Sequence, residues 1–161
     1  MKNSIAIIPG SFDPITKGHI DIIERTAKIF NEVYVLVSIN DEKHSLFPIE
    51  EKIAFVKDAT STLNNIKVDS YQGLTVDYYK KIGASAIVRG VRDSRDFVVE
   101  EEYDYYNRSF CKEVDTFLMF SSEEFKYLSS SALKILLLND VDISMYVTPM
   151  VYQALKDKFN K

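Results

Sequence analysis

The sequence has little of several features that define whole classes of protein. Its single cysteine, Cys111, cannot form an internal disulfide, and one cysteine with two histidines is too few for a zinc cluster. No apolar run approaches the ~20 residues that cross a membrane. The four apolar residues before Pro9 are too few for the core of a signal peptide. We therefore expect a cytoplasmic protein with no membrane partner and a reduced thiol.

An excess of basic residues is also missing. The chain has 20 Lys and Arg against 24 Asp and Glu, a formal charge of −4, which argues against a nucleic-acid partner. What is present suffices for a globular fold, because 46% of the 161 residues are hydrophobic and 12% are aromatic. No linker or repeat divides the chain, so residues 1–161 are predicted to form one domain.

Two kinds of segment alternate along the chain. Short apolar runs that do not alternate with polar residues predict strands buried on both faces, at 5–8, 33–39, 66–70, 86–88 and 116–120. Helical spacing occupies the intervals and the end of the chain, at 20–30, 49–63, 76–82, 95–111, 132–138 and from Thr148-Pro149 onward. This order predicts an α/β fold with a doubly wound, five-stranded parallel sheet.

The most informative stretch, Pro9-Gly-Ser-Phe-Asp-Pro-Ile-Thr-Lys-Gly-His19, lies between the first strand and the first helix. Ligands of doubly wound sheets bind beyond the carboxyl ends of strands, where Gly10 and Gly18 would let the backbone come close. The N-terminus of the following helix attracts anions. The stretch matches neither the dinucleotide fingerprint nor the phosphate-binding P-loop. Gly18 and His19 alone would equally fit an ordinary loop with a capping histidine.

Three further blocks carry polar chemistry. Arg89-Gly-Val-Arg92 follows a predicted strand and suits a polyanion, although ion-paired structural arginines would fit the same residues. Ser129-Ser-Ser131 opens a late helix, where serines are first of all caps. Lys43 lies in the loop after the second strand, and on its own it would be a solvated loop lysine. Glu100-Glu-Glu102, taken alone, is typical of a solvated helix face.

With the stretch 9–23, these blocks resemble the bacterial phosphopantetheine adenylyltransferases, which are nucleotidylyltransferases with a Thr/His-x-Gly-His motif, here Thr16 to His19. The resemblance runs from Ile7 to about Leu155. It implies a Rossmann-like domain that reversibly transfers an adenylyl group from ATP to 4′-phosphopantetheine, giving dephospho-coenzyme A and pyrophosphate by direct in-line displacement, a step of coenzyme A biosynthesis. It also implies a homohexamer, with Mg²⁺ carried mainly by the ATP phosphates.

The resemblance also implies roles for individual residues. His19 would bind the α-phosphate, Ser11 and Lys43 would hold the attacking phosphate, and Arg92 would act with them as a catalytic group. The acceptor would contact Ser11, Lys43, Thr75 and Arg89. The residues implied to bind ATP are Ser11, Phe12, His19, Gly90, Val91, Arg92, Glu100, Phe125, Lys126, Tyr127, Leu128, Ser129, Ser130 and Ser131. No residue is implied to bind a metal directly.

Two alternatives remain open at this point. The first is another small nucleotidylyltransferase, with nicotinate mononucleotide or glycerol 3-phosphate as the acceptor. The second is a non-catalytic nucleotide-binding protein on the same fold, which the presence of His19, Lys43 and both arginines disfavours. The chain also departs from the family beside Glu100, since Val98-Val99 stands where relatives usually have Glu-Tyr.

Overall fold

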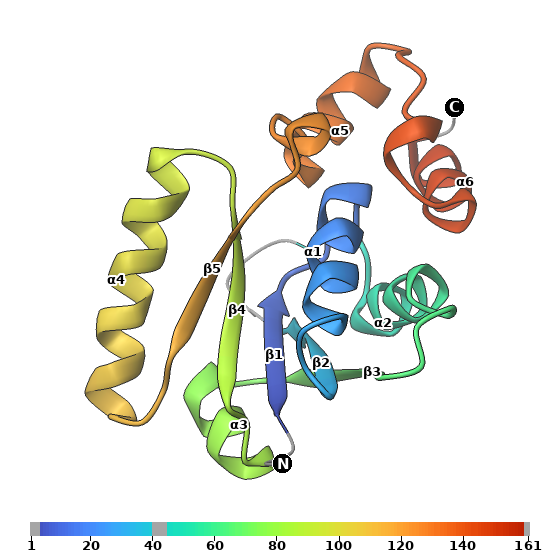
Figure 1. The fold of residues 1–161 in the computed structure, drawn as a ribbon. Coiled ribbons are helices and arrows are strands. Elements are labelled where there is room, and N and C mark those ends of the chain that lie inside the picture. Colours follow the sequence, from blue (N-terminus) through green and yellow to red (C-terminus); the bar gives the residue numbers. More distant parts are fainter. Residues whose placement is uncertain (1–3, 40–44, 160–161) are drawn as a thin grey trace.

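The computed structural model describes residues 4–39 and 45–159, and in them five parallel strands form one sheet with the order β3-β2-β1-β4-β5 (Figure 1). The strands are β1 (Ile5–Gly10), β2 (Glu32–Ser38), β3 (Ile66–Tyr71), β4 (Ala86–Val91) and β5 (Thr116–Phe120). The helices are α1 (Lys17–Ala27), α2 (Ile49–Ala59), α3 (Thr75–Ile82), α4 (Ser94–Phe110), α5 (Ser130–Leu138) and α6 (Pro149–Phe159), with short 3-10 turns at Glu123–Phe125 and Ser144–Tyr146. This is the predicted Rossmann-like α/β fold.

The sheet separates two hydrophobic cores, because successive side chains of a strand point to opposite faces. Ala6 and Ile8 of β1 pack in the larger core with α1, α2, α5 and α6. Ile7, between them, packs in the smaller core with residues of α3 and with Cys111, which is buried as a free thiol. β1, β2 and β4 are buried on both faces, which explains why they appear in the sequence as continuous apolar runs. The edge strands β3 and β5 contain exposed residues, so the prediction of burial on both faces is wrong for them.

The chain reverses direction across the sheet at β1. From β1 it winds through α1 to β2 on one side, and it returns through α3 to β4 on the other side, so β2 and β4 flank β1. The crossover helices at this point leave on opposite faces, which opens a crevice beyond the carboxyl ends of β1 and β4. α4 lies beside β4 and β5 (Figure 1). None of the described helices is long and apolar enough to cross a membrane.

The ends of several elements differ from the prediction. β4 continues through Val91, so Arg89 and Gly90 lie in the strand and not in the loop after it. The reason is pairing with β5, in which Gly90 is matched with Met119 and Val91 with Phe120. The helices predicted for 20–30 and 49–63 end earlier, at Ala27 and Ala59. Their last apolar residues, in the turns that follow, still pack against the core.

Candidate functional site

Two adjoining pockets lie at the carboxyl edge of the sheet. The larger has a volume of about 460 Å³ and is lined by the turn after β1, the end of β4, the first half of α4 and the start of α5. The smaller, of about 320 Å³, lies next to it toward α3 and the second half of α4. The two share six lining residues, Pro9, Gly10, Ser11, Arg89, Glu100 and Tyr103. They therefore form one cleft with two lobes.

The turn after β1 enters α1 with a complete N-terminal cap. Thr16 is the cap residue, and its hydroxyl accepts from the backbone N–H of His19 (3.4 Å). In return, Nδ1 of the His19 ring accepts a hydrogen bond from the backbone N–H of Thr16 (3.0 Å). The ring of Phe12 packs edge-on against His19 and folds over Gly10, where a Cβ would lie 2.9 Å from the ring. These contacts fix the imidazole at the floor of the larger lobe.

This cap also decides the chemical state of His19. Because Nδ1 accepts a hydrogen bond from an amide, the ring proton of the neutral form lies on Nε2. Burial, followed by the positive charges of Arg92 and Arg89, lowers the pKa of His19 to about 4. At neutral pH the imidazole is therefore an uncharged hydrogen-bond donor through Nε2. The expected anion contact then rests on an N–H group and not on a cation.

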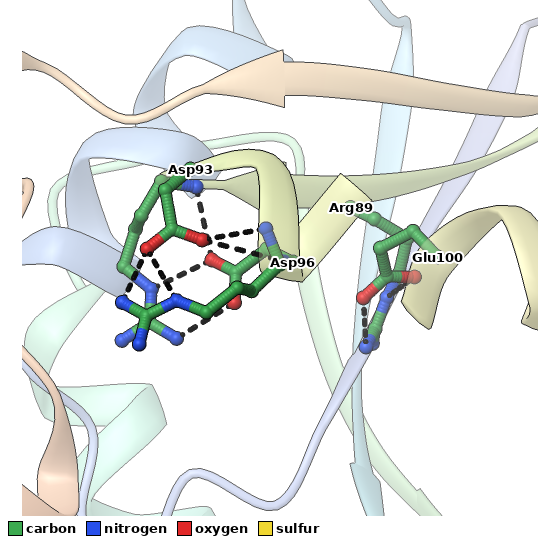
Figure 2. Close-up of polar contacts among 6 residues, drawn as sticks. Arg89, Asp93, Asp96 and Glu100 are labelled. Carbon is green, nitrogen blue, oxygen red and sulfur yellow. Dashed lines mark hydrogen bonds and ion pairs between the residues drawn. The ribbon is translucent and has the colours of Figure 1, made fainter. Parts of the chain in front are cut away.

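Arg89 lies between the two lobes, and each of its three guanidinium nitrogens donates one hydrogen bond. Its Nε and Nη2 donate to the two carboxylate oxygens of Glu100 (2.8 and 2.7 Å), and its Nη1 donates to the carbonyl oxygen of Pro9 (Figure 2). Glu100 is 6% exposed, so the prediction of a solvated helix face is wrong at this residue, although Glu101 and Glu102 are exposed. The pair is a bidentate one, and bidentate geometry fixes the direction of the guanidinium.

Arg92 is held in the same way from the first turn of α4. Asp96 accepts from Nε (2.8 Å), Nη2 (3.0 Å) and the backbone N–H (2.9 Å) of Arg92 (Figure 2). Hydrogen bonding from Arg92 holds the pKa of Asp96 below its ordinary value. Asp93 caps α4 and pairs with Arg95, whose side chain is exposed. Both arginines are therefore ion-paired, as the alternative interpretation predicted, and both also line the cleft.

The serine block closes the far side of the larger lobe. Ser129 caps α5 by accepting from the backbone N–H of Ala132 (3.0 Å), and the Ser130 hydroxyl donates to the carbonyl oxygen of Pro14 (2.8 Å). The preceding segment reaches back to α1, where a Cβ on Gly18 would lie 3.3 Å from that of Phe125. The N-termini of α1 and α5 therefore open onto the same lobe, and each offers N–H groups to an anion.

The structure brings most of the predicted site residues together. Ser11, Phe12, His19, Arg89, Gly90, Arg92, Glu100, Phe125, Leu128, Ser129, Ser130 and Ser131 line the larger lobe, and Thr75 lines the smaller one. Val91 is buried, Tyr127 is highly exposed with Lys126 beside its ring, and none of these three lines either lobe. Lys43 lies outside the described residues. Nζ of Lys134, in α5, lies 3.6 Å from the carboxylate oxygen Oδ2 of Asp13.

One face of α4 contributes more to the cleft than the sequence suggested. Asp96, Val99, Glu100, Tyr103, Asp104 and Asn107 all line a lobe. Their spacing of three and four residues is that of a single helix face, and this signal was present in the sequence. The stripe is mostly polar, whereas the inward face of a helix is ordinarily apolar, so the spacing alone did not mark it as a lining face. Ser38, at the end of β2, was missed as well.

Comparisons with known proteins agree with this geometry. Residues 7–135 match the family model described as cytidylyltransferase-like. The crystal structure of a Vibrio parahaemolyticus protein assigned as a nicotinate-nucleotide adenylyltransferase superposes with a TM-score of 0.69, over 95% of this chain and 98% of that one. At 24% sequence identity, this likeness establishes the fold.

Proposed function

Because the chain belongs to the cytidylyltransferase-like family of nucleotidyltransferases, we propose that it transfers the adenylyl group of ATP to 4′-phosphopantetheine, releasing pyrophosphate and dephospho-coenzyme A. The observation that carries this proposal is the two-lobed cleft. The larger lobe has the helix N-termini and phosphate-binding groups that a nucleotide requires, and the smaller lobe has room for an acceptor. Ser11 and Arg89, at the boundary, would meet the phosphate of the acceptor where it attacks the α-phosphate of ATP.

The lining of the smaller lobe favours a neutral, polar acceptor arm. Beyond Arg89 and Glu100, which neutralise one another, its charged lining residue among those described is Asp104, whose carboxylate accepts from Arg108 (2.8 Å). Ser38, Thr75 and Asn107 add hydroxyl and amide groups. Amides and hydroxyls of a pantetheine arm can bond to such groups, whereas the carboxylate of nicotinate mononucleotide would face Asp104.

Direct displacement makes modest demands on the protein. The attacking phosphate monoester is already an anion, so no strong base is required, and catalysis consists of positioning and of stabilising charge in the transition state. His19 would donate from Nε2 to the α-phosphate, and the N-terminus of α5 would hold the β- and γ-phosphates. Arg92 would bind the same chain of phosphates through the guanidinium hydrogens that Asp96 leaves free.

A magnesium ion would enter with the nucleotide. The described residues contain no group of three or more His, Cys, Asp or Glu side chains arranged to hold a metal. We expect the ion to be bound chiefly by phosphates and water, which Mg²⁺ prefers. Assembly into a homohexamer and a cytoplasmic location remain predictions from the resemblance and the composition.

The test is an assay of pyrophosphate release with ATP and each of three acceptors, 4′-phosphopantetheine, nicotinate mononucleotide and glycerol 3-phosphate. We expect turnover with phosphopantetheine and little with the others. His19→Ala should lower turnover by about two orders of magnitude or more while nucleotide affinity changes much less, because the lost donor acts mainly on developing charge.

Two results would overturn the proposal. Turnover with nicotinate mononucleotide and none with phosphopantetheine would assign the smaller lobe to a different acceptor. ATP binding without pyrophosphate release for any of the three acceptors would indicate a nucleotide-binding protein without catalysis.

A further inference from the structure

Two carboxylates on one face of α4 hold the two arginines of the cleft. Asp96 and Glu100 are one helical turn apart, and they engage Arg92 and Arg89 respectively, each through two guanidinium nitrogens (Figure 2). Each arginine precedes α4 and each carboxylate lies on it, so one rigid element sets the direction of both guanidinium groups.

The pairing leaves the larger lobe close to neutral. The charged groups lining it, in the chain as described, are Arg89, Arg92, Asp96 and Glu100, and His19 is uncharged at neutral pH. An unpaired arginine in a concave site attracts any small anion. A paired one has part of its charge offset, so an anion must make additional contacts to bind well. A polyphosphate ester can do so at the N-termini of α1 and α5.

The two pairs differ in accessibility. The side chains of Arg92 and Asp96 are 38% and 23% exposed, whereas those of Arg89 and Glu100 are 26% and 8% exposed. Water and ligand can therefore reach the Arg92–Asp96 pair, and removal of its carboxylate leaves no deeply buried charge. At Glu100 the same removal would strand a more buried arginine, at a greater cost in stability.

We propose that Asp96 is a positioning and selectivity residue: it aims Arg92 at the phosphate chain of the nucleotide and, by offsetting its charge, keeps simple inorganic anions from filling the lobe. The proposal rests on the proposed function in one respect, that the ligand is a nucleoside polyphosphate. Its two consequences have opposite signs, because loss of the carboxylate strengthens the attraction for a free anion and weakens the orientation of Arg92.

The test is Asp96→Asn, which removes the charge and keeps an oxygen that can accept from the backbone N–H of Arg92. The matched control is Asp93→Asn. It makes the same change of charge in the same turn, Asn caps helices as well as Asp does, and the Arg95 partner is exposed and lines neither lobe. Calorimetric titration with inorganic pyrophosphate measures anion affinity, and steady-state kinetics measure kcat. Thermal unfolding confirms that both variants fold.

For Asp96→Asn we expect pyrophosphate to bind roughly tenfold more tightly and kcat to fall by about tenfold or more. For Asp93→Asn both quantities should stay within about twofold of the wild type. In an Arg92→Gln background, the added Asp96→Asn change should no longer tighten pyrophosphate binding, since Asp96 acts through Arg92. That comparison also serves if the single variant does not fold.

Weaker or unchanged pyrophosphate affinity in Asp96→Asn would overturn the inference, as would an equal tightening in Asp93→Asn. The titration requires no turnover, so it remains decisive even if the wild-type protein transfers nothing to any acceptor. Failure of the proposed function and failure of this inference are therefore separate results.

Discussion

The acid sensitivity of His19 gives a prediction whose size follows from the structure. In the folded protein burial, followed by the charges of Arg92 and Arg89, lowers the pKa of His19 from 6.5 to about 4. Above pH 7 the imidazole is neutral in both the folded and the unfolded chain and contributes nothing. Between about pH 6.5 and pH 4 the unfolded chain binds a proton that the folded protein does not. The free energy of unfolding therefore decreases as the pH is lowered through this range. The loss from this residue is about 2 kcal/mol at pH 5 and about 3 kcal/mol below pH 4.

Urea unfolding of the wild type and of His19→Asn, at intervals from pH 8 to pH 5, measures this loss. The asparagine side chain can still accept from the Thr16 backbone through its oxygen, and it has no proton to gain in this range. All other titratable groups are common to both proteins, so the difference between the two profiles isolates His19. The wild type should lose about 2 kcal/mol relative to the variant by pH 5. Parallel profiles would refute the lowered pKa of His19.

Three further substitutions test how the turn after β1 is built and held. Gly18→Ala should leave the free energy of unfolding within about 1 kcal/mol of the wild-type value, since alanine favours the helix. It should weaken ATP binding by up to roughly tenfold, because its Cβ displaces Phe125. Urea unfolding measures the first effect and calorimetric titration with ATP the second. Asp13→Asn should cost about 1–3 kcal/mol, because the carboxylate accepts from the backbone N–H groups of Leu46–Phe47 (2.7 and 2.9 Å) and an amide can accept only one of them. Lys134→Met, which removes the 3.6 Å ion pair with Asp13, should cost less than about 1 kcal/mol in the same urea experiment, and an equal loss would assign the role of Asp13 to its charge.

Local rules account for the part of the fold that the sequence predicted well. β1, β2 and β4 are buried on both faces, so their apolar runs could be recognised without knowledge of their neighbours. The alternative of a capping histidine was equally local, since a histidine in the first turn of a helix that follows a threonine cap depends on helix-end chemistry alone. The resemblance to nucleotidylyltransferases is confirmed at the level of the family. The pantetheine acceptor remains a prediction.

Pairings between distant residues decided what the sequence did not predict. Whether Glu100 is solvated or buried depends on Arg89, which approaches it only when α4 lies along β4. The end of β4 likewise depends on β5, which pairs with it through Val91. A residue in an acidic triplet gives no local sign that one of the three faces an arginine. The spacing of Asp96 and Glu100 indicates a shared face, but not which way that face points.

The acidity of the whole chain is compatible with a polyanionic ligand because the cleft does not depend on net positive charge. Its arginines are paired and its histidine is neutral. The remaining groups that attract an anion are the backbone N–H groups at the starts of α1 and α5, which carry partial positive charge. These dipoles are fixed by the backbone, need no counter-ion when the site is empty, and attract phosphate when it arrives. A site of this kind binds through the number and direction of its donors. Long-range charge contributes less, and the affinity for a nucleotide should accordingly depend less on ionic strength than it would with two unpaired arginines.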